Sequence, residues 1–305
     1  MGERDLRGKP IADGILEQVR KEAEEMSEQG WSPKLVSITV GDVEAVDVYV
    51  RNQRRTAERA GIEFQERHFP GDVTQDELRT AISAMNVDPR ITGIIIQRPV
   101  PEQISVKALQ TAIHPFKDVE GMHPTSIGNI VYSDTEIAPC TAAASVEMLK
   151  ATGMSLEGME VVVIGHSEIV GKPIAFLLMA EGATVTVCHH MTRSVQIHSR
   201  RADAIFVAVG KPRLITGDMI KPGAAVIDIG INAIEEDGVE KLVGDVDYET
   251  ASEVAGWITP VPGGVGPVTV SILMRNTMAA LRRQKEAYDK QFAEQQDKVV
   301  ATPSE

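Results

Sequence analysis

The 305-residue sequence is poor in cysteine, in aromatic residues and in long apolar runs. Its two cysteines, Cys140 and Cys188, lie far apart and form no CxxC pair, which indicates a reducing compartment and argues against a cysteine-based metal framework. Aromatic residues make up only 4% of the chain, so few side chains can act as stacking platforms. Apolar runs long enough to span a bilayer and an apolar N-terminal signal segment are both missing, so we expect a cytoplasmic protein with no membrane partner.

Positive charge is also scarce relative to negative charge, and the formal net charge is -13. A field of this sign repels polyanions, which argues against nucleic acid as a partner. A small anionic ligand remains possible because helix N-termini and glycine turns bind anions locally. The length exceeds what one core usually holds, which favours two domains.

Strands and helices alternate along the first third of the chain. Strand patterns occupy residues 34–41, 63–69 and 91–97, and the last of these is a nearly continuous β-branched run typical of a strand covered on both faces. Helical patterns lie between them, one containing Tyr49, and another opened by a capping box of Thr74 and Glu77. This alternation predicts a parallel α/β sheet.

A second series of strands follows a linking helix over 139–153. The expected strands are 160–165, 183–188, 204–210 and 224–230, and a long helix is expected from about Val268 onward. The predicted fold class is therefore α/β, with two α/β domains of which the second is a Rossmann-like, doubly wound parallel sheet.

The turn after the first strand of this second series is the clearest nucleotide-binding motif. Gly165 permits a tight turn, Gly171 permits close packing of the next helix, and Pro173 fits the first helical turn. The helix N-terminus is then expected to be free to hold a pyrophosphate. The pattern GxSxxxGxP, which contains Ser167, departs from GxGxxG, and a purely structural turn is the alternative; the strand, turn, helix and strand context favours a nucleotide.

The following strand ends in histidines, with no carboxylate to bind a ribose 2′-hydroxyl. Its end carries His189, His190, Thr192 and Arg193, which favours a 2′-phosphate and hence NADP, with NAD as the alternative. We interpret His189 as an ordinary surface residue. Two histidines make no metal site without further ligands, so no metal is predicted.

Several motifs together resemble the bifunctional methylenetetrahydrofolate dehydrogenase/cyclohydrolase family. They occur in the family's order and span nearly the whole chain. The matching stretches are GIIIQRPVP at 93–101, HPFKDVEGMHP at 114–124, PCT at 139–141, VIGHSEIVGKP at 163–173, VAVGKP at 207–212, VIDIGIN at 226–232 and ITPVPGGVGPVTV at 258–270, together with the tyrosine motif around Tyr49.

The resemblance implies an N-terminal folate-binding catalytic domain of residues 1–138 plus 268–305 that faces an NAD(P)-binding domain of residues 139–267 across a cleft. It also implies a homodimer and a small-molecule folate substrate. The implied substrate-binding residues are Tyr49, Gln97, Glu120, Pro262, Gly263, Gly264 and Val265. The implied cofactor-binding residues are Gly165, His166, Ser167, Ile169, Val170, Gly171, His190, Val209, Gly210, Ile231 and Thr269.

The resemblance assigns catalysis to Tyr49, Gln53, Gln97 and Glu120, and the sequence departs from the family at two of these positions. Gln53 stands where the family has a lysine that serves the cyclohydrolase step, and Glu120 stands where it has an aspartate. Hydride removal from the methylene bridge needs positioning more than proton transfer. Hydrolysis of the methenyl cation needs a group that titrates near neutrality, which an amide does not do. We therefore predict a dehydrogenase with weak or absent cyclohydrolase activity.

Three alternatives to this prediction are a full bifunctional enzyme, a relative that binds folate without catalysis, and an enzyme for a different one-carbon carrier. Away from the resemblance, Tyr49 fits a half-buried helix residue, Asp118 a brace for its turn, and Lys117 a structural ion pair. Cys140 and Cys188 fit small buried residues.

Overall fold

The computed structural model describes residues 5–236 and 238–300. These residues form two compact units. The three-stranded unit consists of residues 17–124 with the chain from 274 onward, and the five-stranded unit consists of the chain up to residue 16 with residues 125–273. Two helices, α1 (Gly8–Glu28) and α10 (Val265–Val300), contribute residues to both units.

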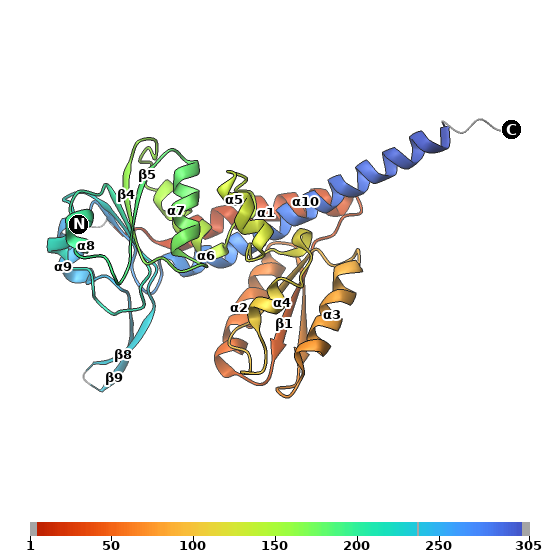
Figure 1. The fold of residues 1–305 in the computed structure, drawn as a ribbon, viewed down its shortest axis with the longest axis horizontal. Coiled ribbons are helices and arrows are strands. Elements are labelled where there is room, and N and C mark those ends of the chain that lie inside the picture. The colour runs from red at the N-terminus through yellow and green to blue at the C-terminus, as the bar shows by residue number, and fades with distance from the viewer. Residues whose placement is uncertain (1–4, 237, 301–305) are drawn as a thin grey trace. The chain divides into compact units, whose positions relative to one another are not determined.

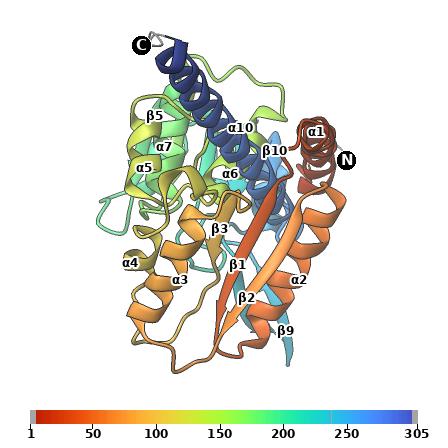
Figure 2. The same cartoon turned by 90° about the vertical axis from the view of Figure 1, so that its right-hand side faces the viewer.

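The three-stranded unit contains a parallel sheet in the order β2-β1-β3. Its strands are β1 (Lys34–Val40), β2 (Glu63–Phe69) and β3 (Gly93–Ile96), with helices α2 (Glu44–Arg59), α3 (Gln75–Val87), α4 (Val106–Gln110) and the 3-10 helix η1 (Pro115–Lys117). All three strands lie where the sequence patterns predicted them. Figure 1 shows α2 and α3 on opposite sides of β1, and Figure 2 shows the three strands in full.

Alternation along β1 divides the sheet into an apolar and a polar face. One hydrophobic cluster joins Val36, Ile38 and Val40 of β1 to Leu78, Ile82 and Met85 of α3. Because side chains alternate along a strand, Ser37 and Thr39 face the other way, toward α2. The predicted capping box is confirmed: Thr74 caps α3, and Glu77 returns a bond to the Thr74 backbone.

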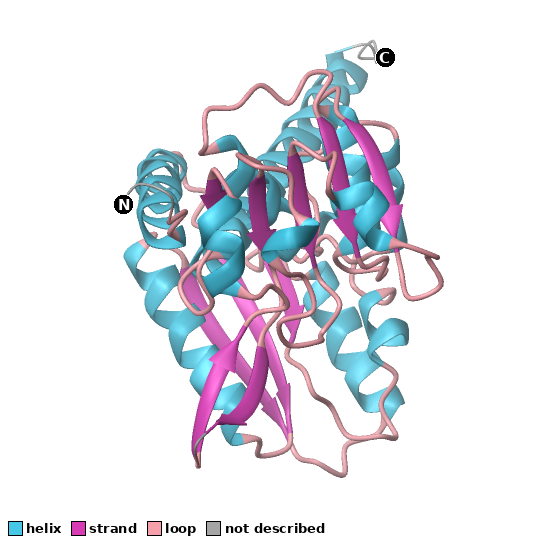
Figure 3. Ribbon diagram, turned by 90° about the vertical axis from the view of Figure 1, so that its left-hand side faces the viewer, coloured by secondary structure: helices cyan, strands magenta, loops and turns pink. Residues whose placement is uncertain are grey.

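The five-stranded unit contains a parallel sheet in the order β10-β7-β6-β4-β5. Figure 3 shows strands of this sheet side by side. Its strands are β4 (Glu160–Ile164), β5 (Thr184–Cys188), β6 (Ala204–Val207), β7 (Ala225–Asp228) and β10 (Trp257–Ile258). Its other helices are α5 (Pro124–Val131), which begins at the boundary between the units, α6 (Cys140–Lys150), α7 (Gly171–Ala180), α8 (Val195–Ser199), α9 (Tyr248–Val254) and the 3-10 helix η2 (Gly217–Met219). If these five strands are numbered 1 to 5 along the chain, their order across the sheet, read from β5, is 2-1-3-4-5. This is the order of one common doubly wound fold. The strand order therefore reverses between β4 and β6, and ligands bind at this switch point in such sheets.

The sequence patterns did not predict the antiparallel hairpin of β8 (Asn232–Glu236) and β9 (Val239–Val243). The two strands are mostly exposed, so they lack the apolar run that marked the others. The final helix begins at Val265, three residues before the expected start. Within the described residues we find no helix whose length and apolar character would let it cross a membrane.

Candidate functional site

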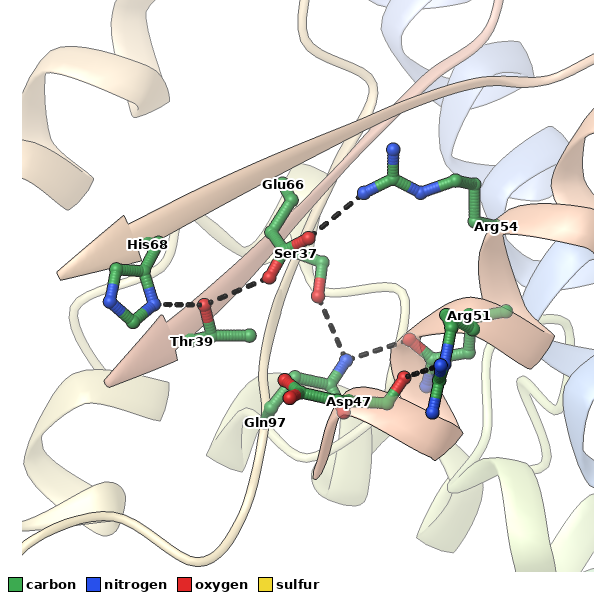
Figure 4. A network of polar contacts seen from close by, with 9 residues as sticks. Ser37, Thr39, Asp47, Arg51, Arg54, Glu66, His68 and Gln97 are labelled. Atoms are coloured by element: carbon green, nitrogen blue, oxygen red, sulfur yellow. Dashed lines mark hydrogen bonds and ion pairs between the residues drawn. The ribbon is translucent and has the colours of Figure 1, made fainter. Parts of the chain in front are cut away.

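Gln97 directly follows β3 and lies at the carboxyl end of the three-stranded sheet. Its Nε2 donates to Gln53 Oε1 at 2.7 Å and to Ser37 Oγ at 2.9 Å. Gln53 comes from α2 and Ser37 from β1, so three elements meet at one amide; Figure 4 shows the bond between Gln97 and Ser37. Gln53 and Gln97 are only 5% and 7% exposed. Burial and mutual bonding hold the two amides in one arrangement.

Tyr49, one helical turn before Gln53, is far more exposed than the buried residues of α2 around it. It is 47% exposed, whereas Val46, Val50 and Gln53 are buried. The buried positions 46, 50 and 53 follow the helical period, so Tyr49 lies at the margin of the buried stripe. The Tyr49 side chain is thus about half exposed, while the Gln53 side chain points inward.

A second polar chain crosses the same face of the sheet (Figure 4). Thr39 Oγ1 donates to Glu66 Oε1 at 3.2 Å and lies 3.2 Å from His68 Nδ1. Arg54 Nη2 donates to Glu66 Oε2 at 2.9 Å. Arg54, which follows Gln53 in α2, is therefore engaged by a carboxylate of β2.

Glu120 lies beside the end of β3. Asp118 and Ile94 form an isolated parallel bridge, so residues 118–120 run along the edge of this strand. Ile96, the last residue of β3, donates its backbone N–H to Glu120 Oε2 at 3.5 Å. The carboxyl group is thereby held one residue away from Gln97.

Burial raises the pKa of Glu120 to about 7; the positive charge of Arg98 opposes this shift and the negative charge of Asp118 adds to it. A carboxyl group in this range exchanges protons at neutral pH. Glu120 is thus a residue of the predicted folate site whose pKa lies close to neutral pH.

Asp118 and Lys117 have structural partners. The Asp118 carboxylate accepts from the backbone N–H groups of Met122 and His123 at 3.2 and 2.8 Å, which confirms that it braces the turn. The buried Lys117 ammonium donates to two backbone carbonyls at the end of α3, Met85 O and Asp88 O, at 2.8 and 2.6 Å. The hydrogen bonds of this ammonium cap a helix end, and the negative charge of Asp88 acts on it as well.

In the five-stranded unit, the turn between β4 and α7 leaves no space for side chains at its two glycines. Gly165 has φ of +113°, and a Cβ there would lie 2.1 Å from Ala208 O. A Cβ at Gly171 would lie 2.0 Å from Gly165 O. The tight turn and the close helix approach predicted for these glycines are confirmed.

The start of α7 differs from the expected free N-terminus. Ser167 Oγ accepts from the N–H groups of Val170 and Gly171 at 3.2 and 3.4 Å, and Ser167 O accepts from Lys172 N at 3.1 Å. The following Pro173 has no N–H group. The first-turn amides therefore donate within the chain, and a pyrophosphate that used them would displace Ser167 Oγ.

The ends of β6 and β7 carry further residues predicted for the cofactor. Val209 and Gly210 lie just beyond β6, and Ile231, 67% exposed, lies just beyond β7. Asp245, which the sequence analysis did not single out, accepts from Val209 N at 2.6 Å and Gly210 N at 2.9 Å. This carboxylate fixes the loop at the strand-order reversal.

The sequence patterns also did not identify Asp228, the last residue of β7, as a functional residue. It is 3% exposed and accepts from the N–H groups of Gly230, Asp245 and Val246 at 2.9 to 3.0 Å. Burial raises the pKa of Asp228 to about 6 against the effect of these bonds. The signal for Asp228 was an acidic residue inside an apolar run, which requires internal donors.

The loop of Pro262, Gly263, Gly264 and Val265 leads into α10. Gly263 has φ of +108°, and a Cβ at Gly264 would lie 2.7 Å from Pro260 O. Gly263 O accepts from Gly8 N at 2.9 Å. Close backbone packing thus fixes this loop, and Thr269 follows on the first turns of α10, where its Oγ1 donates to Val265 O at 3.3 Å.

Three histidines gather at the ends of β4 and β5. Their possible ligand nitrogens all lie within 4.8 Å of one another: His166, His189 and His190. His189 is half-buried, with its ring centre 4.6 Å from that of His166. Desolvation and the electrostatic influence of His189, Lys172 and His190 lower the pKa of His166. His189 is therefore part of a cluster, contrary to its interpretation as an ordinary surface residue, because strand pairing brings His166 beside it.

The two cysteines differ in exposure: Cys188 is buried, as expected, and Cys140 is partly exposed. Burial raises the pKa of the Cys188 thiol. This thiol lies at the end of β5, immediately before the histidines.

The sheets and strand-end residues define a two-domain α/β protein with a Rossmann-like nucleotide-binding domain. The catalytic-domain model of the tetrahydrofolate dehydrogenase/cyclohydrolase family matches residues 6–120, and the family's NAD(P)-binding-domain model matches residues 139–285. The chain therefore belongs to the tetrahydrofolate dehydrogenase/cyclohydrolase family.

Individual relatives agree with this assignment over nearly their full lengths. The chain is 68% identical to Bifunctional protein FolD 2 of Mesorhizobium japonicum, over 94% of each chain. The crystal structure of the bifunctional enzyme FolD from Campylobacter jejuni is similar with a TM-score of 0.87 at 38% identity, covering 91% of this chain and 98% of that one. FolD of Trypanosoma brucei, crystallised with NADP cofactor and an inhibitor, has a TM-score of 0.85 at 35% identity and covers 92% and 97%.

Proposed function

We propose that this protein is an NADP-dependent 5,10-methylenetetrahydrofolate dehydrogenase. The observation that carries the proposal is that both family domain models match in order, while the ends of β3 and β4 hold the polar and glycine residues that the chemistry requires. The reaction transfers a hydride from the methylene bridge to the nicotinamide and leaves 5,10-methenyltetrahydrofolate, a cation shared by two nitrogens. When bound, NADP supplies the hydride acceptor.

The folate-binding residues act in this proposal by positioning. Tyr49 offers an exposed ring against which a pterin can stack, and Gln97, held by Gln53 and Ser37, offers its remaining amide oxygen. Glu120 and the backbone of Pro262, Gly263, Gly264 and Val265 complete the proposed substrate set. Because no proton leaves the reacting carbon, alignment provides most of the catalysis in the hydride step.

Our proposal for the cyclohydrolase step starts from Gln53. This side chain is buried and its oxygen is already bonded to Gln97, so it orients a neighbour and moves no proton. On this basis cyclohydrolase activity is weak or absent. The names of the relatives, which include Bifunctional protein FolD 2 at 68% identity, favour the full bifunctional enzyme as the second candidate. Glu120, with its pKa near 7, is the group that could supply proton transfer in that case.

One experiment separates the two candidates. NADPH formation from methylenetetrahydrofolate and decay of added methenyltetrahydrofolate are measured separately in the wild type, Gln53→Lys, Glu120→Gln and Glu120→Asp. The monofunctional enzyme would be supported if methenyltetrahydrofolate decays at the uncatalysed rate with the wild type and faster than that with Gln53→Lys. Fast wild-type decay that follows a pKa near 7 and is lost in Glu120→Gln would support the bifunctional one. Absence of NADPH formation would refute the proposed dehydrogenase.

The choice of NADP rests on the end of β5. It carries His189, His190 and Arg193 and no carboxylate to bind a 2′-hydroxyl, and the relative from T. brucei was crystallised with NADP. We expect kcat/KM for NADP to exceed that for NAD at least tenfold. Equal values for the two cofactors would contradict this assignment.

Two further alternatives have their own tests. Saturable NADP binding without hydride transfer would indicate a binding protein, and hydride transfer from another reduced pterin in a panel would indicate a different one-carbon carrier. The family resemblance also leads us to propose a homodimer, to be measured by light scattering. For the domain boundaries we propose residues 1–138 plus 268–305 and 139–267; the start of the NAD(P)-binding-domain match at residue 139 supports the first boundary, and that match extends to residue 285.

A further inference from the structure

We propose that His166, His189 and His190 form a binding site for a divalent first-row transition-metal ion, with Zn²⁺ as the reference ion. The convergence of three imidazoles from two strand ends carries the proposal. It goes beyond the proposed dehydrogenase activity, since it concerns an ion bound to the protein alone, and it shares His166 and His190 with the proposed cofactor-binding set.

Strand register explains why the three histidines converge. β4 and β5 are parallel neighbours in which Ile164 pairs with Cys188, and Gly165 N donates to Cys188 O at 2.9 Å beyond that pair. His166 and His190 each lie two residues past the paired positions, so they emerge side by side. His189 lies one residue past Cys188, and its ring centre is 4.6 Å from that of His166.

The backbone that carries the histidines is fixed on both sides. Close contacts of Gly165 and Gly171 hold the His166 segment. On the other strand, His189 N donates to Thr192 Oγ1 at 2.9 Å, which closes a tight turn. Only side-chain rotation is then required to bring the nitrogens to an ion, so little backbone order has to be created on binding.

The ring geometry is close to that of three imidazoles around one ion. A tetrahedral ion bound at roughly 2.0 Å from each nitrogen separates the nitrogens by about 3.3 Å and the ring centres by about 5 Å. Here the ring centres are 4.6, 5.9 and 6.1 Å apart, and the planes are inclined by 32° to 55°. The nitrogens, within 4.8 Å of one another, need to approach by about 1.5 Å at most, by the same tetrahedral geometry.

One contact has to be given up. Met191 N donates to His189 Nδ1 at 3.2 Å. If Nδ1 bound the ion, the ion would take the place of the Met191 N–H group. If Nε2 bound the ion, the ring proton would move to Nδ1, which could then no longer accept a hydrogen bond from Met191 N. The loss weakens the site in either case without blocking it, since the bond is long and exposed.

The donor set selects the class of ion. Three neutral imidazoles suit Zn²⁺, Co²⁺, Ni²⁺ and Cu²⁺, whereas Mg²⁺ and Ca²⁺ prefer oxygen ligands. Three protein ligands leave a fourth position for water or another donor, which is the arrangement of open zinc sites. His166 and His190 are exposed, so the ion can enter from solvent.

The test uses the full chain without an affinity tag. Zn²⁺ binding is measured by calorimetry, and Co²⁺ is added to follow the visible absorption of a tetrahedral site. We expect one ion per chain, a loss of affinity of at least tenfold in His166→Ala and in His190→Ala, and no change in His114→Ala. His114 is the matched control because it is an exposed histidine that serves as the N-cap of η1 in the other unit.

Folding of each variant is checked by its thermal unfolding without metal, so that loss of the site is distinguished from loss of the domain. If His166→Ala unfolds early, His166→Gln replaces it. Binding of one ion that persists unchanged when both His166 and His190 are replaced would overturn the proposal, and so would the absence of Zn²⁺ and Co²⁺ binding by the folded wild type.

Discussion

The two strand-end sites of this protein are built in different ways. At the end of β4 the decisive feature is backbone shape, with Gly165 and Gly171 packed so closely that a Cβ at either would lie about 2 Å from a carbonyl oxygen. At the end of β3 the decisive feature is a group of side chains, in which Gln97 bonds to Gln53 and Ser37. A backbone site should fail when one methyl group is added, whereas a side-chain site should change its chemistry while the fold persists.

The largest expected effect tests the backbone side of this comparison. Gly171→Ala forces a Cβ against Gly165 O and should destabilise the five-stranded unit by about 3 kcal/mol. Unfolding in urea is followed by the fluorescence of Trp257 in a Trp31→Phe background, which leaves one tryptophan, in β10.

Gly14→Ala is the matched control for this substitution. Gly14 lies inside α1 with no heavy atom within 4 Å of the added methyl, so helix propensity alone should stabilise the protein by up to about 1 kcal/mol. Similar losses in both variants would show that the turn is not specially packed.

The second effect tests whether the Glu120 carboxyl lowers the free energy of unfolding at neutral pH. Burial raises the pKa of Glu120 from 4.5 to about 7, so the folded state binds more protons than the unfolded state between these values, and stability falls as pH rises through this window. Glu120→Gln removes the titration and should be more stable than the wild type above pH 7, by on the order of 2–3 kcal/mol, and equal to it near pH 4.

Glu77→Gln provides a control of opposite sign. The Thr74 hydroxyl and backbone lower the pKa of Glu77, so this carboxylate stabilises the fold above the unfolded-state pKa and its stabilisation disappears as pH falls. Denaturant titrations of both variants at a series of pH values should therefore show differences of opposite direction. A difference for Glu120→Gln that is independent of pH would contradict the shifted pKa.

The third effect concerns the amide pair. Gln53→Ala leaves Gln97 Nε2 without its 2.7 Å partner and should cost 1 to 3 kcal/mol, on the order expected for a buried donor that loses its acceptor. Gln18→Ala on the exposed face of α1 should change stability by less than about 0.5 kcal/mol. Equal effects on the urea midpoint would mean that the pair contributes nothing specific.

The smallest effect lies at the edge of the same polar face. Arg54 pairs with Glu66 at 2.9 Å, but its side chain is 44% exposed. Arg54→Ala should therefore cost less than about 1 kcal/mol, with a smaller cost at high salt. A larger cost that is insensitive to salt would show that contact of Arg54 with the Phe64 ring, 5.5 Å from its guanidinium carbon, matters more than the ion pair.

The strands and the glycine turn were predictable because their signals are local. An apolar β-branched run such as 93–97 is too short and too continuous for an amphipathic helix, and Gly165 after such a run permits a turn that other residues resist. The hairpin of β8 and β9 was missed because its strands are exposed and lack that contrast. Asp228 and Asp245 were missed because their partners are backbone amides brought from other loops.

The sequence by itself determined the family and the order of the parallel strands other than β10, and it predicted that Gln53 stands where the family has a titratable lysine, since these depend on residue type and spacing. The tertiary structure decided that Gln53 is buried against Gln97, that Lys117 caps α3, and that burial brings the Glu120 carboxyl to titrate near neutrality. It also decided that His166 joins His189 and His190, residues more than 20 positions away in the chain. The physical reason is the same in each case: desolvation and hydrogen bonding depend on distances between segments, and strand pairing sets those distances.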